Sequence, residues 1–232
     1  MARAFPPNEE QELIRRFFGD TPGFFVEVGA NDPHARSQTY HLEQKGWTGL
    51  LIEPQPDLAE ALRANRRARV FAVACSDPAH DGDTLTLHVA GPLSSLNRER
   101  MAPGTVPDGA IAVPVRTLDR VLAEGGAPPG FDFLSIDVEG HELEVLSGFD
   151  ARRWQPRLIL LEDHVENLAK HRAVRAMGYR LIRRYENNGW YVPEDAPQRI
   201  ASGDRWEIVR KYYLALPFCI IRNALRAARK KD

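Results

Sequence analysis

The sequence has few cysteines, no long apolar run and almost no net charge. Its two cysteines, Cys75 and Cys219, are too few for a disulfide framework or a zinc ribbon, which indicates a reducing compartment. The longest apolar stretch, residues 212–221, has about half of the roughly 20 residues that a membrane-spanning helix needs, and it contains Pro217. A formal net charge of -1 gives no overall attraction for polyanions, so a dedicated nucleic-acid binder is not supported.

A signal-peptide core is also missing, because charged residues occur throughout the first 20 positions. We therefore expect a cytoplasmic protein. The length of 232 residues, with 43% hydrophobic and 27% charged side chains, is ordinary for one globular domain. No internal repeat or linker is visible, so we divide the chain into a helical N-terminal segment at 1–22, a main domain at 23–204 and a C-terminal tail at 205–232.

Apolar patterns of strand and helix periodicity alternate along the main domain. We expect strands at 23–28, 49–53, 69–74, 84–89, 113–115, 131–136, 157–161, 179–183 and 189–192. We expect helices at 8–18, 39–45, 58–65 with Asp57 as N-cap, 117–124, 142–146 and 167–177. This alternation predicts an α/β fold, a mostly parallel sheet with helices on both faces and ligands at the carboxyl ends of its strands.

Glycine is scarce where a dinucleotide would need it. Gly29, directly after the first strand, is the only glycine between residues 24 and 45, so the G-x-G-x-x-G pyrophosphate loop of NAD and FAD enzymes is absent. Gly29 either serves a tight turn or lets the backbone approach a ligand. Glu53 ends the next strand 24 residues later, where it can accept hydrogen bonds from ribose hydroxyls. Glu27 suits an amino-acid ammonium group better than a phosphate, which favours an adenosyl cofactor carrying an amino acid.

A third strand end follows at residues 74–77, at the depth where an adenine would lie. Cys75 and Ser76 are small enough to leave room for the base. The alternative for Cys75 is a buried core thiol without a ligand contact.

Four blocks of sequence carry a resemblance to a known family. They are FVEVGAND at 25–32, LLIEP at 50–54, Leu118-Asp119, and FDFLSIDVEGHELEVL at 131–146. In their order and spacing, over roughly residues 20 to 165, they resemble the FkbM family of methyltransferases. The resemblance implies a class I, Rossmann-like methyltransferase domain that uses S-adenosylmethionine, usually on a hydroxyl oxygen of a sugar or natural product. The cofactor-binding residues would be Glu27, Gly29, Ala30, Asn31, Glu53, Pro54, Cys75, Ser76 and Asp137.

Two positions depart from the family pattern. Pro33, with its fixed φ, stands where the family often has glycine, and Gln38 stands where it commonly has asparagine. We therefore expect the loop after Asn31 to follow a different path.

The acceptor chemistry is expected at the ends of the fourth and fifth parallel strands. Methyl transfer is a displacement in line with the methyl group, so the protein must align the acceptor and remove its proton. One interpretation uses Asp137 together with Glu139 or His164 as direct general base, with His141 as a further candidate. Helix N-terminal charge is the alternative role for Glu139 and Glu142. In the second interpretation a divalent ion, Mg²⁺ or Mn²⁺, activates the acceptor and is bound by Asp137, Glu162 and Asp163.

Residues 91–108 are rich in Gly, Pro, Ser and Asn, and a segment of this length predicts a lid over the acceptor that contains Ser94, Ser95 and Asn97. The tail combines apolar residues with eight Lys and Arg against two acidic residues, a net charge of +6. Such a helix either lies on an anionic membrane or packs on the core or on a second subunit. Membrane association and a homodimer are therefore both alternatives for the tail.

The sequence therefore predicts an S-adenosylmethionine-dependent O-methyltransferase with a small-molecule or glycan acceptor and no nucleic-acid partner. One alternative is a non-catalytic cofactor-binding adaptor at a membrane or in a biosynthetic complex. The other is an NAD-dependent sugar oxidoreductase or epimerase, which would need the missing glycine-rich loop.

Overall fold

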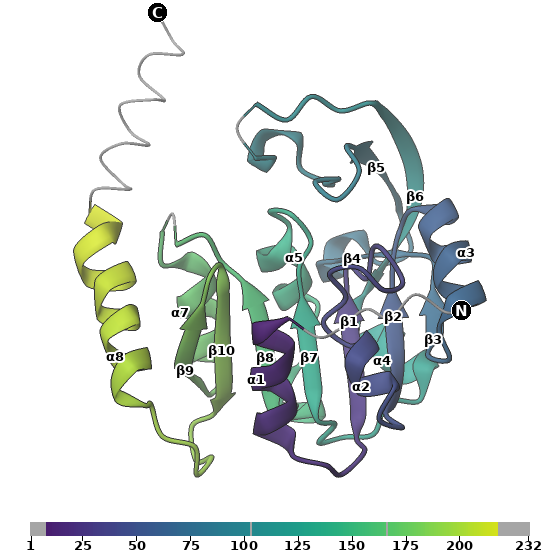
Figure 1. Cartoon of the computed structure of the whole chain (residues 1–232). Coiled ribbons are helices and arrows are strands. Elements are labelled where there is room, and N and C mark those ends of the chain that lie inside the picture. Colours follow the sequence, from purple (N-terminus) through teal and green to yellow (C-terminus); the bar gives the residue numbers. More distant parts are fainter. Residues whose placement is uncertain (1–7, 103, 166, 218–232) are drawn as a thin grey trace, which may run out of the picture.

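The computed structural model describes residues 8–102, 104–165 and 167–217, and its strands and helices alternate along the chain (Figure 1). The strands are β1 (Phe24–Val28), β2 (Thr48–Ile52), β3 (Arg69–Phe71), β4 (Ala74–Ser76), β5 (Thr84–Val89), β6 (Gly109–Thr117), β7 (Phe133–Ile136), β8 (Leu158–Glu162), β9 (Tyr179–Tyr185) and β10 (Asn188–Pro193). The α-helices are α1 (Glu9–Phe18), α2 (Tyr40–Glu43), α3 (Pro56–Asn65), α4 (Leu118–Gly125), α5 (Glu142–Ser147), α6 (Ala151–Trp154), α7 (Ala169–Ala176) and α8 (Ser202–Val209).

The main sheet has seven strands in the order β3-β2-β1-β7-β8-β10-β9. Strands β3, β2, β1, β7 and β8 run parallel, whereas β10 is antiparallel to both of its neighbours. The first strand, β1, lies in the middle of the sheet, and β2 and β3 are added on one side of it. The chain then crosses over to β7, which pairs with the other side of β1. The order in which strands are added thus reverses between β1 and β7, and open α/β sheets bind ligands at such a point. The predicted α/β fold is confirmed.

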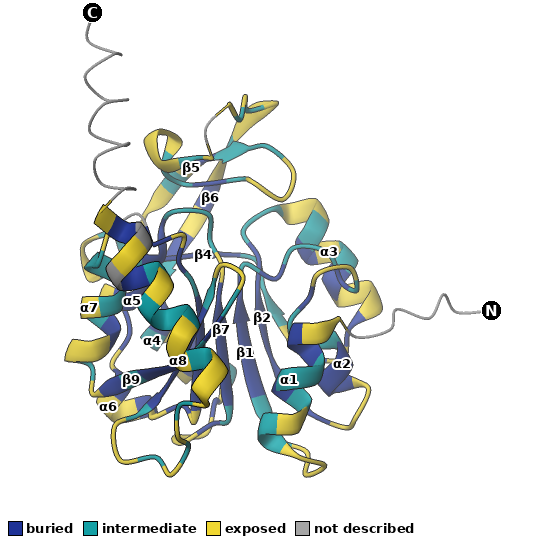
Figure 2. Ribbon diagram, turned by 60° about the vertical axis from the view of Figure 1, so that its left-hand side comes forward, coloured by how far each residue is buried: buried dark blue, intermediate teal, exposed yellow. Residues whose placement is uncertain are grey.

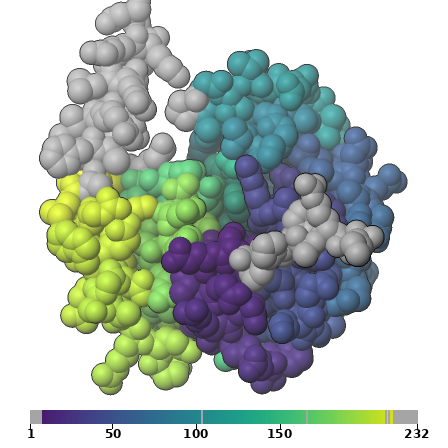
Figure 3. Space-filling model, viewed as in Figure 1, coloured from purple at the N-terminus to yellow at the C-terminus, as the bar shows by residue number. Residues whose placement is uncertain are grey.

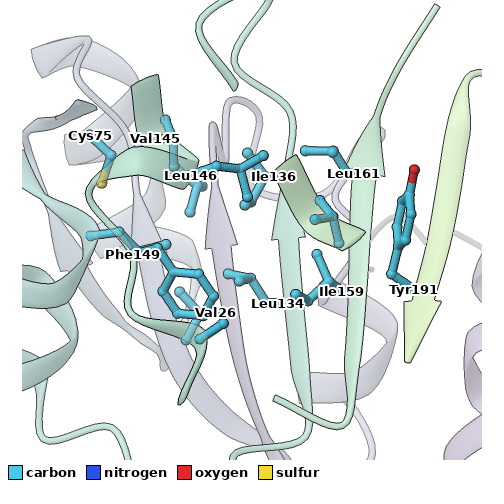
Figure 4. Packing of buried hydrophobic residues seen from close by; sticks show 14 of the residues in the cluster. Val26, Cys75, Leu134, Ile136, Val145, Leu146, Phe149, Ile159, Leu161 and Tyr191 are labelled. Atoms are coloured by element: carbon cyan, nitrogen blue, oxygen red, sulfur yellow. The ribbon is translucent and has the colours of Figure 1, made fainter. Parts of the chain in front are cut away.

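Alternate residues of each central strand pack into two separate cores. The central strands β1, β2 and β7 are mostly dark blue, for buried, in Figure 2. Val26 points to the core that α4, α5, α6 and α7 cover, and Phe25 points to the core under α1, α2 and α3. Figure 4 shows the first of these cores, where Val26, Leu134 and Ile159 meet residues of α5. Both faces of the central strands are therefore buried from solvent, which explains their uninterrupted apolar sequences.

A second, three-stranded sheet in the order β4-β6-β5 lies beyond the carboxyl ends of the main strands. Its presence corrects two expectations. The single strand expected at 69–74 is divided into β3 and β4, which belong to different sheets, because the chain turns at residues 72–73 and Val73 packs into the core. The short strand expected at 113–115 is the middle of the nine-residue strand β6, which pairs along its length with β5.

Helix starts follow local chemistry, with one correction. Helix α1 begins at a capping box in which Asn8 and Gln11 exchange hydrogen bonds, close to the predicted start. Asp57 is not the N-cap of α3. That helix begins at Pro56, two residues before the predicted start, because the fixed φ and missing N–H of proline suit the first helical position, and Gln55 is the N-cap. Helix α6, which Asp150 caps, was not predicted.

The predicted tail boundary at residue 205 falls inside α8. Helix α8 and the π-helical segment η3 (Arg210–Ala215) pack beside β9, and Tyr212 and Leu216 are buried in the core. Most of the basic cluster, and Cys219, lie outside the described residues. Within the described part of the chain, no helix is long and apolar enough to cross a membrane.

Candidate active site

A cleft opens at the carboxyl ends of β1, β2 and β7, at the point where the strand order reverses. The predicted residues that line it are Glu27, Gly29, Ala30, Asn31, Glu53, Pro54, Cys75, Asp137 and Glu139. Ser76 does not line the cleft. It is completely buried, and its hydroxyl shares a hydrogen bond of 2.9 Å with Nε2 of His141. The structure therefore brings together residues from four separate segments of the sequence, as predicted.

Gly29 is required by the protein itself. Its φ of 82° is in the left-handed region, and a Cβ atom there would lie 1.8 Å from the main-chain oxygen of Asp137. The N–H groups of Gly29 and Ala30 both donate to the carbonyl of Ile52. This glycine lets the ends of β1, β2 and β7 meet at the floor of the cleft, so both functions considered for it, a tight turn and an open approach to a ligand, are compatible.

Glu53 is held rigidly at the end of β2. One carboxylate oxygen accepts a hydrogen bond of 2.9 Å from the N–H of Asn31, and the other accepts one of 2.9 Å from the N–H of Gln55. Burial raises the pKa of Glu53, and these two hydrogen bonds oppose that effect. A carboxylate has about four acceptor sites. The remaining acceptor sites suit a pair of neighbouring hydroxyl groups.

Cys75 lies farther along the same cleft, beyond Pro54. The thiol is buried, which raises its pKa to about 12, so it stays protonated and does not act as a nucleophile. It packs into the core and also lines the cleft, and its contact with a ligand stays a prediction.

Glu27 is fully buried at the cleft and anchors the loop after β1. Its carboxylate accepts hydrogen bonds from the hydroxyl of Ser37, the N–H of Gln38 and the hydroxyl of Thr39. Burial raises its pKa, and the charge of Arg66 counteracts this. The expected contact between Glu27 and an ammonium group stays a prediction. In the structure, the hydrogen bonds of Glu27 hold the loop after β1 in place.

Arg66 and Glu43 form a buried ion pair behind this loop that sequence reasoning missed. The two side chains are 0% and 2% exposed, and Nε of Arg66 lies 3.0 Å from the Glu43 carboxylate. The guanidinium also donates to the carbonyl of Pro33 and to the hydroxyls of Ser37 and Thr39. The path of residues 31–39 is thus determined by a charged network that no local motif encodes.

Three carboxyl groups gather beside the cleft, of which Asp137 and Glu139 line it. Oxygen atoms of Asp137, Glu139 and Glu162 lie within 4.8 Å of one another. Asp137 follows β7, Glu139 is two residues further on with a left-handed φ of 52°, and Glu162 ends β8. Left-handed backbone at a residue other than glycine costs energy and is concentrated at functional sites.

The three acids do not ionise together. Asp137 faces the cleft but has protein on most sides, so desolvation and the nearby charges of Glu162 and Glu139 raise its pKa well above the ordinary range. Burial would raise the pKa of Glu162 as well, but hydrogen bonding and charge from His164 lower it overall. The interaction between the two side chains thus raises the pKa of Asp137 and lowers that of Glu162. Desolvation and Glu162 raise the pKa of Glu139 to about 7.

Asp163 does not belong to this group, which corrects the predicted set of metal ligands. Consecutive residues at the end of a strand point to opposite faces, so Glu162 joins Asp137 while Asp163 turns away. Its carboxylate accepts hydrogen bonds from the N–H of Val165 and the hydroxyl of Tyr212. Glu139 takes the place that the prediction gave to Asp163.

The histidines and Glu142 surround the acids in supporting positions. His164 is half exposed, and its Nε2 lies 3.2 Å from Glu162, which raises the histidine pKa. His141 binds Ser76 on the far side of the loop. Glu142 is completely buried, accepts from the N–H of Gly140 and pairs with Lys170 at 2.6 Å. Its role is to fix the loop after β7, in keeping with the structural alternative.

The segment between β5 and β6 borders the cleft, and its teal atoms lie at the upper right in Figure 3. Its residues Gly91, Pro92, Ser94 and Leu96 line the cleft. Ser95 is buried and donates a hydrogen bond of 2.7 Å to the carbonyl of Glu139.

A second tie lies further along the same segment. The Arg100 guanidinium donates to the carbonyl of Gly140 and pairs with Glu144 at 3.0 Å. The segment is therefore attached to the loop that carries the acids.

A family model described as the methyltransferase FkbM domain matches residues 27–181, which is more than half of the chain. The matched range begins at Glu27 in β1 and ends within β9, so it contains every acid of the cleft. No curated protein matches the sequence.

Solved structures of similar fold include three that describe the range. Methyltransferase FkbM from Methylobacillus flagellatus KT is 15% identical with a TM-score of 0.47, and the match covers 74% of this chain and 43% of that one. Monomeric WbdD is 16% identical with a TM-score of 0.43, covering 83% and 42%. A methyltransferase-like protein from Silicibacter pomeroyi DSS-3 is 12% identical with a TM-score of 0.45, covering 90% and 96%. The chain spans less than half the length of the first two.

Proposed function

Because the chain belongs to the FkbM methyltransferase domain family, we propose that it transfers a methyl group from S-adenosylmethionine to a hydroxyl oxygen of a sugar, glycan or related natural product. The family uses S-adenosylmethionine, and the mostly parallel sheet is the class I fold that the sequence resemblance implied. This membership favours an enzyme over an adaptor. The missing pyrophosphate loop argues against the NAD-dependent alternative.

The residues of the cleft fit the cofactor. Glu53, fixed by two main-chain hydrogen bonds, keeps acceptor sites for the ribose hydroxyls. Pro54 and Cys75 continue the cleft on one side with apolar surface for an adenine, and Gly29 leaves its floor without a side chain. The amino-acid part then extends toward Glu27. The observation that carries the proposal is this fixed Glu53 in a cleft that Asp137 and Glu139 also line, with Glu162 beside them.

The acids suit the removal of a proton from a hydroxyl group. S-adenosylmethionine supplies an activated methyl group when bound, so the protein needs to align the acceptor and accept its proton. Glu139, with a pKa of about 7, is ionised in about half of the molecules at neutral pH and is our candidate for the general base. Asp137, whose pKa Glu162 helps to raise, orients the acceptor oxygen. His164 acts through Glu162, whose charge it stabilises.

A divalent ion is the second way to use the same acids. Asp137, Glu139 and Glu162 offer only oxygen ligands, which are the ligands that Mg²⁺ and Mn²⁺ prefer. Incubation with EDTA followed by dialysis distinguishes the two chemistries. Full activity after this treatment leaves the general base alone, and loss of activity that Mg²⁺ or Mn²⁺ restores favours the ion.

The proposal is tested by release of S-adenosylhomocysteine from S-adenosylmethionine in the presence of a panel of glycans and hydroxylated natural products. Asp137→Ala should lower turnover at least about a hundredfold, since it removes a group that positions the acceptor. Its circular dichroism spectrum should match that of the wild type. Glu60→Ala, at an exposed acid of α3 that does not line the cleft, is the matched control. Wild-type turnover in the Asp137→Ala protein would contradict our placement of the site.

A further inference from the structure

Arg36 is the only lysine or arginine that lines the cleft within the described part of the chain. The acidic residues that line the same cleft are Glu27, Glu53, Asp137 and Glu139. A ligand with a negative group therefore finds a single cation there, and its location is on the loop after β1 rather than among the acids after β7.

The Arg36 side chain is exposed, and no described residue forms an ion pair or hydrogen bond with its guanidinium. Arg66, which lies under the same loop, is in the opposite situation, because it is completely buried and donates to four partners. The two arginines thus have different roles at this loop. Arg66 holds the loop in place, while Arg36 is available to a ligand.

The backbone of Arg36 has a φ of 67°, which is unusual for a residue other than glycine. Both sides of it are fixed. Asp32 accepts hydrogen bonds from the N–H groups of His34 and Ala35, and Glu27 accepts from the N–H of Gln38. Such a conformation persists when the surroundings over-determine it, and it is concentrated at ligand-binding sites. The loop therefore presents Arg36 at the cleft in a defined orientation.

We propose that Arg36 binds the carboxylate of the methionine moiety of S-adenosylmethionine. This inference rests on the proposed function. With the ribose at Glu53 and the adenine toward Cys75, the amino acid extends toward Gly29 and the loop that carries Arg36. The carboxylate needs a cation or several N–H groups in a cleft that is otherwise acidic. Guanidinium and carboxylate match in shape and form paired, charge-assisted hydrogen bonds.

Calorimetry with two probes tests this assignment. S-adenosylhomocysteine carries the amino acid, whereas 5′-methylthioadenosine has the same adenosine and sulfur without it. Arg36→Gln should weaken binding of S-adenosylhomocysteine about tenfold to a hundredfold, the usual range for loss of a charge-assisted hydrogen bond. Binding of 5′-methylthioadenosine should not change. Arg36→Lys should lie between the wild type and Arg36→Gln, because it keeps the charge but not the paired geometry.

Arg63→Gln is the matched control, since Arg63 is an exposed arginine of α3 that does not line the cleft. Unchanged binding of S-adenosylhomocysteine by Arg36→Gln would overturn the proposal, and a raised KM for the acceptor would then assign Arg36 to the acceptor. Equal loss for both probes would also overturn it, by showing a general effect on the loop. Failure of the wild type to bind either probe would instead refute the proposed function.

Discussion

Glu139 combines a strained backbone with a carboxyl group whose pKa is close to neutral. A general base must be ionised, so kcat/KM should rise with pH and level off above about pH 7. Glu139→Gln should lower kcat by about 10² to 10⁴ and remove this pH-dependent rise. The measurement is initial rate against pH at saturating S-adenosylmethionine. A rise near pH 7 that survives in Glu139→Gln would assign the base to another group.

The same raised pKa has a consequence for stability whose sign can be stated. The folded state binds the proton of Glu139 more tightly than the unfolded state, so this group stabilises the fold below about pH 4.5. That contribution is lost as the pH rises through about 7. Urea unfolding at both ends of this range should show a smaller decline in unfolding free energy for Glu139→Gln than for the wild type.

At the scale of single residues, the sequence was informative where a residue's role depends on its own strand end. Gly29, Glu53 and Asp137 could be placed in the cleft because each directly follows an apolar strand. Asp163 was misplaced because two adjacent acids were assigned to one site, although neighbours in a strand point to opposite faces. Arg66 could not be found, because its partners are 23 to 33 residues away in sequence.

The loop at 31–39 is an element whose shape depends on one buried cation. Arg66→Met leaves Glu43 and Glu27 buried without their positive partner, which should cost about 3–5 kcal/mol of unfolding free energy. Urea unfolding at neutral pH measures this loss, with Arg63→Met as control, since Arg63 is an exposed residue of α3, the helix that Arg66 caps at its C-terminus. A loss no larger than the control's would show that the network is not needed for the fold.

The segment at 91–108 is predicted to act as a lid over the acceptor. The double variant Ser95→Ala, Arg100→Ala removes both of its ties to the loop after β7. We expect the KM of the acceptor to rise several-fold, because the wall of the acceptor site loses its position, while S-adenosylhomocysteine affinity stays the same. Steady-state kinetics and calorimetry check the two quantities. A changed cofactor affinity with an unchanged acceptor KM would contradict the lid.

Elements with strong apolar periodicity were predicted well, and the exceptions have physical reasons. The five parallel strands of the main sheet are buried on both faces, so their sequences are continuous and apolar. The break between β3 and β4 has no Gly or Pro to indicate it, because Val73 continues the apolar pattern through the turn. Helix α6 has four residues, too few to show a helical period.

At the scale of the whole molecule, the distribution of charge gives a prediction for the tail. Residues 205–232 carry a net charge of +6, and Trp206 and Leu214 are exposed on the part that the structure describes. If the tail lies on anionic lipid, the full chain should sediment with phosphatidylserine vesicles more than a chain ending at residue 217 does, and added salt should reduce the difference. Equal sedimentation of the two chains would exclude this role and favour packing on the core, where Tyr212 and Leu216 already lie, or on a second subunit.

The contact between Gly29 and the carbonyl oxygen of Asp137 fixes the spacing of β1 and β7 at the floor of the cleft. Two main-chain segments touch there. The distance between the proposed cofactor site and the acids after β7 is therefore set by the backbone, and side-chain changes elsewhere cannot adjust it. A new acceptor of different size must therefore be accommodated from outside the sheet. Diversification of acceptor choice is expected in residues 91–108, while Gly29→Ala should abolish activity on every acceptor alike.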